Sequence, residues 1–246
     1  NLHIAASGNY NLFTTTNATY DPTLHVEDCT VDAAYNVVYD SHNTQNFQKI
    51  YFGNSIVKMT VANKPFYSTK AKDAHTQQLI RLDNNVFYAE TPLQNYLINC
   101  GDRSQAFQTT RLQVEVTNNT IYNIYQPNIM IRAYVLAGLT VTKNVGYYTG
   151  VTAKNYLTGV YDTAGFTADK AEVTYNYLYT APVSDTNFWS AKHTGSYTPA
   201  NNQMGDGVEA PFSSMDAAKG YFPVDASVVK TGAGATYDTK AWFKTE

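Results

Sequence analysis

The side chains that most often carry chemistry in proteins are scattered along this sequence. The five histidines never form a His-x-x-x-His pair and never lie beside a Cys-x-x-Cys pair; they are His3, His25, His42, His75 and His193. Zinc requires three or four ligands at tetrahedral distances, and the sequence offers no close pair of candidates. We therefore predict no metal site and no cofactor.

Nucleophilic and acid–base chemistry is equally hard to place. Cys29 and Cys100 are the only cysteines; two buried thiols are the default expectation and a disulfide is the alternative, because sequence separation does not decide pairing. Neither cysteine lies near both a base and an orienting partner. The carboxylates in residues 206–209 lack the alternating Asp/Asn pattern of a calcium loop, which favours a solvated loop. We predict that the chain is not an enzyme.

Aromatic side chains are the remaining candidates for binding. Exposed Tyr and Trp rings can stack on sugars or bases, although packing in the core or at a subunit interface is the more common role. Two further tyrosines lie in the polar N-terminal stretch. The predicted assembly or contact residues are Tyr10, Tyr20, Tyr147, Tyr148, Trp189 and Trp242.

The charge of the chain argues against a nucleic-acid or membrane surface. The net charge is −3, and the densest basic group, Lys64, Lys70 and Lys72, reads as a solvated loop. A nucleic-acid-binding domain would carry a basic patch, so nucleic acid would be bound only through an arm that this chain lacks. No run of about 18 apolar residues predicts a membrane span.

The composition predicts β-structure. The 31 threonines, 23 asparagines and 21 tyrosines make up close to a third of the chain. Thr and Tyr suit a pleated, half-buried surface, and Asn suits turns because it tolerates left-handed backbone. Residues 111–117 alternate strictly, with Leu112, Val114 and Val116 facing inward. The predicted strands are 33–39, 55–62, 78–89, 111–117, 129–136, 139–143 and 172–179.

The predicted fold is a jelly-roll-like antiparallel β-sandwich with long decorating loops and one or two short helices. Asp83-Asn84-Asn85 indicates a hairpin turn within 78–89. Thr91-Pro92-Leu93-Gln94 fits a capping box that opens a helix over 92–100, and residues 213–220 fit a second short helix. Because neither a linker nor an internal repeat is apparent, we expect one domain, 24–246, after an extended N-terminal arm, 1–23.

One stretch resembles a known family. The alternating strand from Arg111, the turn at residues 117–120 and the apolar strand over 131–136 resemble the middle of single jelly-roll capsid proteins of small circular single-stranded DNA viruses. The resemblance covers about a third of the chain, and it implies two facing sheets and a closed shell of many copies. The chain departs from the family in having no Arg-rich arm.

Assembly is accordingly the expected function. We predict a structural subunit that binds copies of itself in a virion shell. The first alternative is an extracellular filament, pilus or surface-adhesin subunit whose N-terminal arm adds to a neighbour's sheet. A carbohydrate-binding module is the third candidate. Asn17 and Asn118 fit the N-glycosylation pattern, as chance allows in a chain this rich in Asn and Thr.

Overall fold

Every regular element that the structure describes is a β-strand, which confirms the predicted all-β class. The computed structural model describes residues 2–5, 11–15, 23–33, 35–40, 47–69, 78–99, 112–126, 129–133, 137–148, 156–160, 171–180, 187–189, 197–205 and 210–236.

The strands form three sheets in which each neighbouring pair of strands is parallel. Sheet A contains β1 (Leu2–Ala5), β4 (Cys29–Ala33), β7 (Ile56–Met59), β10 (Val86–Gln94), β13 (Thr120–Tyr125), β16 (Val145–Tyr148), β19 (Tyr177–Thr180) and β21 (Gln203–Met204). Sheet B contains β2 (Phe13–Thr15), β5 (Val38–Asp40), β8 (Tyr67–Thr69), β11 (Ile98–Asn99), β14 (Ile129–Ala133), β17 (Tyr156–Val160) and β20 (Asn187–Trp189). Sheet C contains β3 (Thr23–Glu27), β6 (Lys49–Gly53), β9 (Leu79–Asp83), β12 (Gln113–Thr117), β15 (Gly138–Thr142) and β18 (Ala171–Thr174).

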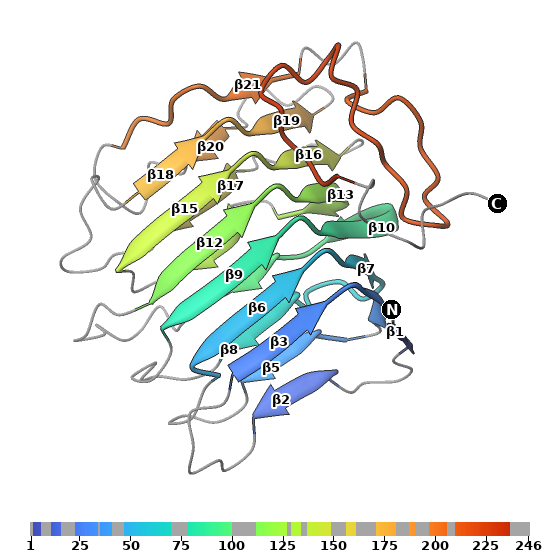
Figure 1. Cartoon of the computed structure of the whole chain (residues 1–246), viewed down its shortest axis with the longest axis vertical. Coiled ribbons are helices and arrows are strands. Elements are labelled where there is room, and N and C mark those ends of the chain that lie inside the picture. Colours follow the sequence, from blue (N-terminus) through green and yellow to red (C-terminus); the bar gives the residue numbers. More distant parts are fainter. Residues whose placement is uncertain are drawn as a thin grey trace.

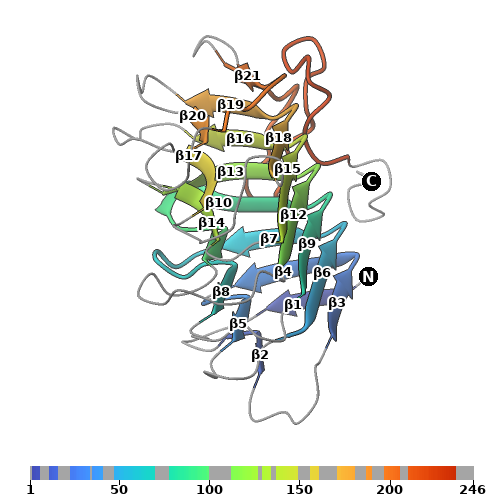
Figure 2. The same cartoon turned by 90° about the vertical axis from the view of Figure 1, so that its left-hand side faces the viewer.

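The order of these strands makes the molecule a β-solenoid. The chain enters sheets A, B and C in turn, so β1, β2 and β3 form the first coil and β4, β5 and β6 lie against it as the second. The same order continues through β18 (Figure 1). Each sheet is one wall around a shared interior (Figure 2). Because a parallel neighbour cannot be reached through a tight turn, the chain passes through two other sheets before it returns.

The interior is filled by columns of equivalent side chains. On sheet C, alternate residues point inward, and successive coils place like on like. One column is Leu24, Ile50, Ile80, Val114, Leu139 and Ala171, and the next is Val26, Phe52, Leu82, Val116, Val141 and Val173. Strands 113–117 and 129–133 both contribute to this single core, as their alternation predicts.

The corner from sheet C to sheet A repeats one local conformation. The residue before the turn has positive φ in every coil: Asp28, Asn54, Asn84, Asn118, Lys143, Tyr175 and Asn201 all have φ between 48° and 58°. Asn and Asp adopt this left-handed region at lower cost than other non-glycine residues. The residue that follows turns its side chain into the interior and forms the ladder described below.

A second, smaller core lies on the outer face of sheet A. Residues 210–236 lie beside β10, β13 and β16 (Figure 1), and their Phe212 and Phe222 are buried against outward-facing tyrosines. Tyr122 stacks on Phe222 at a ring-centroid distance of 4.0 Å and on Tyr147 at 5.2 Å. Burial raises the pKa of Tyr88, in the same column, to about 12. The C-terminal segment is therefore an integral cover of this wall.

The predicted antiparallel jelly-roll sandwich is wrong. Neighbouring strands in all three sheets are parallel, and the strands wind as a solenoid. Asn84-Asn85 is a corner between β9 and β10 in two different sheets, so it closes no hairpin. The misreading arises because left-handed asparagines serve tight hairpins and solenoid corners alike.

The two predicted helices are also wrong, because no helix occurs in the described residues. Pro92 lies inside β10, at a bulge between the pairs Tyr88–Tyr122 and Leu93–Ile124. A bulge tolerates proline because the ladder hydrogen bond is already interrupted there. Residues 217–220 form a turn in which the Tyr221 amide donates to the Asp216 carbonyl oxygen at 2.9 Å.

The N-terminal stretch takes part in the solenoid where it is described. β1 pairs with β4 and β2 pairs with β5, in register with the later coils. Whether residues 1–23 also act as an assembly arm stays a prediction.

Candidate functional site

A continuous network of buried polar side chains runs along the corner between sheets C and A. Asn85, Asn119, Asn144 and Asn176 are fully buried at successive coils, and Asn202 continues the series. From Asn119 onward, the side-chain oxygen of each member accepts both the backbone and the side-chain N–H of the preceding asparagine, at 2.8–3.1 Å. Each side-chain amide also donates to a strand carbonyl, such as that of Leu82 for Asn119. The ladder thus satisfies polar groups that burial would otherwise leave unpaired.

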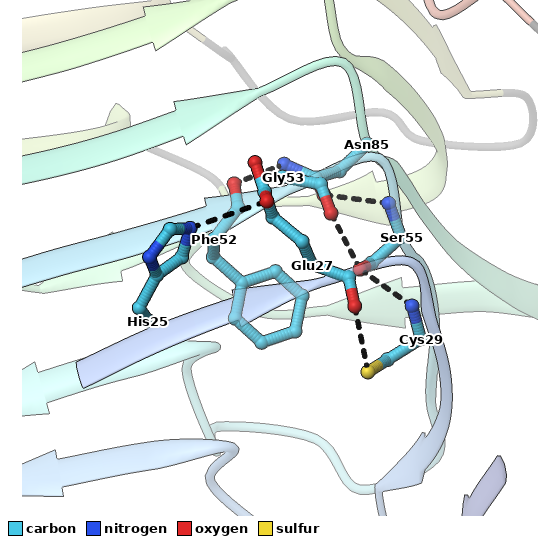
Figure 3. A network of polar contacts seen from close by, with 7 residues as sticks. All are labelled: His25, Glu27, Cys29, Phe52, Gly53, Ser55 and Asn85. Carbon is cyan, nitrogen blue, oxygen red and sulfur yellow. Dashed lines mark hydrogen bonds and ion pairs between the residues drawn. The ribbon is translucent and has the colours of Figure 1, made fainter. Parts of the chain in front are cut away.

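Figure 3 shows the start of this ladder, where Ser55 and Cys29 replace asparagine. The Ser55 amide donates to Asn85 Oδ1 at 3.0 Å, and Ser55 Oγ accepts the Cys29 amide at 3.1 Å and donates to the Gly53 carbonyl at 2.6 Å. The Cys29 thiol donates to the backbone carbonyl of Glu27 at 3.1 Å. Each group has a stabilising partner within the fold.

This network does not form a nucleophilic site. His25 Nε2 lies 3.3 Å from the Glu27 carboxylate, on the outer face of sheet C, and its ring packs against Tyr51. Cys29 is only 7% exposed, and burial raises the pKa of its thiol. A cysteine nucleophile requires the opposite, a lowered pKa and a nearby base. We conclude that the ladder stabilises the stack of coils.

A cavity of about 360 Å³ lies at the corner between sheets A and B. It spans three coils, since its lining comes from the segments that join β4 to β5, β7 to β8 and β10 to β11, together with β5 and β11. Three tyrosines, Tyr35, Tyr39 and Tyr96, supply aromatic rings. The remaining lining residues are Asn36, Asn63, Asn99, Lys64 and Pro65.

The solenoid register brings these residues together. Asn63 has a φ of 59°, and its amide donates to the Gln94 carbonyl at 2.9 Å, which fixes one corner against the next. Asn95 donates to the carbonyl oxygens of Val61 and Lys64 at 3.1 and 2.6 Å. These bonds hold the corner backbone in place, so the cavity is built on a rigid frame.

Cations in and beside the cavity are held by tyrosines. Lys64 Nζ donates to the Tyr35 hydroxyl and lies 4.0 Å from the centroid of the Tyr35 ring. Arg132 lies next to Asn99 in the outward row of sheet B; its Nε donates to Asn99 Oδ1 at 2.8 Å, and its guanidinium carbon lies 4.5 Å from the Tyr96 ring centroid. Such cation–π contacts orient both the charge and the ring.

Asn36 shows an incomplete hydrogen-bond set at the cavity. The residue is 6% exposed, and its Nδ2 donates to Asn11 Oδ1 at 2.9 Å. Its own buried Oδ1 has no hydrogen-bond partner among the described residues. A buried acceptor without a partner costs about 1–3 kcal/mol.

The contact residues predicted from the sequence lie elsewhere. Tyr147 is buried under the C-terminal segment and stacks on Tyr179 at 4.8 Å. Tyr148 and Trp189 are 1% and 4% exposed, and Trp189 packs against Tyr197. All three pack within the subunit. The other predicted residues lie outside the described residues: Tyr10, Tyr20 and Trp242, together with Cys100 and Asn17.

The sequence did not predict the residues that line the corner cavity. Lys64 was interpreted as part of a solvated loop. Nothing in the sequence distinguished Tyr35, Tyr39 and Tyr96 from the other tyrosines. The signal that could have identified them is their position in the coil. Tyr35 and Tyr96 each lie two residues after the end of a sheet-A strand, and Asn99 lies in the sheet-B strand that follows Tyr96. That signal becomes readable only once the coils are aligned.

Metal and membrane features are absent from the part of the chain that the structure describes. No group of three or more His, Cys, Asp or Glu side chains there lies close enough to hold a metal ion. In the same residues no helix is long and apolar enough to cross a bilayer.

Comparison with known proteins assigns no family. No protein-family model matches the chain, and searches of the curated proteins and of the solved structures returned no match.

Proposed function

We propose that this chain is a non-catalytic carbohydrate-binding protein and that the corner cavity is its binding site. The observation that carries the proposal is the composition of the lining, in which three tyrosine rings, three asparagine amides and one lysine surround about 360 Å³. Of the three functions that the sequence suggests, carbohydrate binding is the one for which the fold supplies a built cavity.

The lining matches the chemistry of a sugar. A sugar ring presents C–H faces that pack on aromatic rings and hydroxyls that both donate and accept hydrogen bonds. Tyrosine supplies the flat apolar surface with a polar tip, and asparagine supplies both donors and an acceptor. Among the residues that the structure describes, no Leu, Ile, Val, Phe or Met lines the cavity, which disfavours the apolar ligands that most small-molecule pockets accept.

The proposal includes no catalysis. Glycoside hydrolysis requires two positioned carboxyl groups, and the described part of the lining contributes neither Asp nor Glu nor His. A virion shell loses its main support, since it was inferred from a resemblance to jelly-roll proteins and the fold is a parallel solenoid.

A glycan panel with matched variants tests the proposal. We expect the wild-type chain to bind at least one polysaccharide in isothermal titration calorimetry. Replacing a stacking ring by Ala typically costs about 1–3 kcal/mol, so Tyr39→Ala and Tyr96→Ala should each weaken binding by about tenfold. Tyr51→Ala is the matched control, because Tyr51 lies on the outer face of sheet C beside His25 and Arg81. Equal losses in all three variants, or no binding to any glycan, would contradict the proposal.

A second candidate function is assembly through the first coil. Among the described residues, β1, β2 and β3 each pair on one side only, and Leu2 of β1 is 60% exposed. Open sheet edges can pair with another chain, and stacking of coils would extend the solenoid along its axis. This geometry favours the filament alternative over a closed shell. Electron microscopy at high protein concentration tests it: fibres would support it, and monodisperse single particles would contradict it.

A further inference from the structure

The charge of the corner cavity differs from that of the chain as a whole. The chain carries a net charge of −3, yet Lys64 is the only charged side chain among the described residues that line the cavity. Two other cations on the outer faces are paired with carboxylates, Lys58 with Glu90 and Arg81 with Glu115. Among the described residues Lys64 has no carboxylate partner, and its hydrogen-bond acceptor is a neutral phenol.

Lys64 is also held in place before any ligand arrives. The Tyr35 ring and hydroxyl both contact its ammonium group, which reduces the rotamer freedom that a lysine would lose on binding. The ammonium has three donor hydrogens, so the bond to Tyr35 leaves capacity for further acceptors. A half-buried, oriented ammonium is a good partner for an anion.

A second cation extends the positive charge along the solenoid axis. The register of sheet B aligns residues 39, 68, 99 and 132 in successive coils, which lie about 4.8 Å apart, and the Tyr39, Asn99 and Arg132 side chains of this row are partly exposed. Arg132 is fixed by Asn99 and Tyr96, both of which line the cavity. The guanidinium therefore lies one coil beyond the rings, where the next unit of an extended glycan would pass.

We propose that the carbohydrate bound here is acidic and that its carboxylate or sulfate group is recognised by Lys64, with Arg132 contacting the neighbouring unit. This inference rests on the proposed function, because it names the ligand class of the same cavity. The neutral parts of the sugar pack on the tyrosines and bond to the asparagines, while the acidic group takes the place of the missing carboxylate.

The alternative role for Lys64 is purely structural. Its contacts with Tyr35 would then brace the corner, and its charge would contribute nothing to ligand choice. Lys64→Gln separates the two roles, since glutamine keeps a donor of similar reach for Tyr35 but removes the charge. Lys64→Arg retains the charge, and Lys230→Gln removes an exposed lysine from the C-terminal segment as the control.

The test compares polysaccharides that share a backbone and differ in charge. Titration calorimetry with dextran, carboxymethyl dextran and dextran sulfate, and with polygalacturonate and its methyl ester, supplies neutral, carboxylate and sulfate arms. We expect the wild type to prefer an acidic member over its neutral counterpart by about tenfold or more. Lys64→Gln should remove that preference, Lys64→Arg should retain most of it, and Lys230→Gln should leave it unchanged.

Each outcome is decisive. Because the attraction is electrostatic, raising the salt concentration from about 0.05 to about 0.5 M should weaken binding of the acidic member and leave binding of the neutral member unchanged. If neutral and acidic members bind equally and Tyr96→Ala weakens both, the inference fails while the proposed function stands. If an acidic member binds as tightly to Lys64→Gln as to wild type, Lys64 has only a structural role and the inference fails. If no member binds, both proposals fail.

Discussion

The asparagine ladder should dominate the stability of the solenoid, and Asn119 is its most informative member. Asn119 is fully buried; its Oδ1 accepts the backbone and side-chain N–H of Asn85 at 2.9 and 3.1 Å, and its Nδ2 donates to Leu82 and Asn144 at 3.0 Å each. In Asn119→Ala the Asn85 side chain keeps its bond to the Phe52 carbonyl. The Asn85 backbone N–H, however, loses its acceptor in a position that water does not reach.

The expected cost follows from these bonds. Leaving one buried N–H without a partner costs about 1–3 kcal/mol, and each hydrogen bond lost contributes about 0.5–1.5 kcal/mol net. We expect Asn119→Ala to lower the free energy of unfolding by about 2–5 kcal/mol, a large part of the about 5–15 kcal/mol typical of a folded protein. Asn119→Ser should cost less, because a hydroxyl at this position can accept the amide, as Ser55 accepts that of Cys29.

Urea unfolding followed by circular dichroism measures this cost. Asn202→Ala is the matched control: Asn202 accepts the backbone and side-chain N–H of Asn176 at 2.8 and 2.9 Å and donates to Val173, but it is only half-buried at the end of the ladder. Water can replace its amide, so we expect a loss of about 1 kcal/mol. If the two alanine variants lose unfolding free energy within about 0.5 kcal/mol of each other, burial does not determine how much each ladder member contributes to stability, and the argument is refuted.

Three further predictions concern the outer core and the thiol. The pKa of Tyr88 is raised from 10.0 to about 12, so its neutral form favours folding; this contribution is complete below pH 10, is lost as the pH rises from 10 to 12, and can be followed by tyrosinate absorbance and alkaline unfolding. Phe222→Ala should cost about 3–5 kcal/mol and speed hydrogen exchange in residues 210–236 while sheet C stays protected; unchanged exchange there would show that this segment does not depend on its aromatic anchor. Cys29, with its pKa raised by burial, should react with thiol reagents in a Cys100→Ser background only as fast as the protein unfolds; rapid labelling of the folded chain would contradict the buried position.

Some strands were predictable because they are encoded locally: the predicted strands 55–62, 111–117, 129–136 and 139–143 overlap β7, β12, β14 and β15. The predicted strand 172–179 was wrong, since it is divided between β18 in sheet C and β19 in sheet A, and β6, β13 and β17 were not predicted. The alternation in residues 113–117 specifies which side chains face the core, and Val114 and Val116 are indeed fully buried. The same alternation occurs in a parallel solenoid and in an antiparallel sandwich, so it does not specify which strand pairs with which. Composition rich in Thr, Asn and Tyr favoured the commoner antiparallel reading.

The repeat escaped detection because the coils differ in length. Successive ladder positions from Cys29 to Asn202 are separated by 26, 30, 34, 25, 32 and 26 residues. A fixed period, which reveals most repeat proteins, is therefore missing. The recurring signal is a left-handed residue followed by a small polar one, as in Asn84-Asn85 and Asn118-Asn119, and each instance by itself reads as an ordinary turn.

The candidate site was less predictable than the fold. Tyr35, Lys64 and Tyr96 come from three different coils and meet only because parallel stacking aligns the same corner of each. Tyr147 and Trp189 were chosen from the sequence because they are aromatic, but burial depends on which face of a strand points inward and on what covers the outer face. Residues 210–236 cover part of sheet A, but their sequence has no pattern that predicts this packing.

A crystal structure of the chain with the tightest-binding acidic polysaccharide fragment tests the central claim most directly. The account predicts a sugar ring against Tyr39 or Tyr96 in the corner cavity, with its acidic group within hydrogen-bonding distance of Lys64 Nζ. A fragment bound on the outer face of sheet C around Tyr51 and Arg81, with the corner cavity empty, would contradict it.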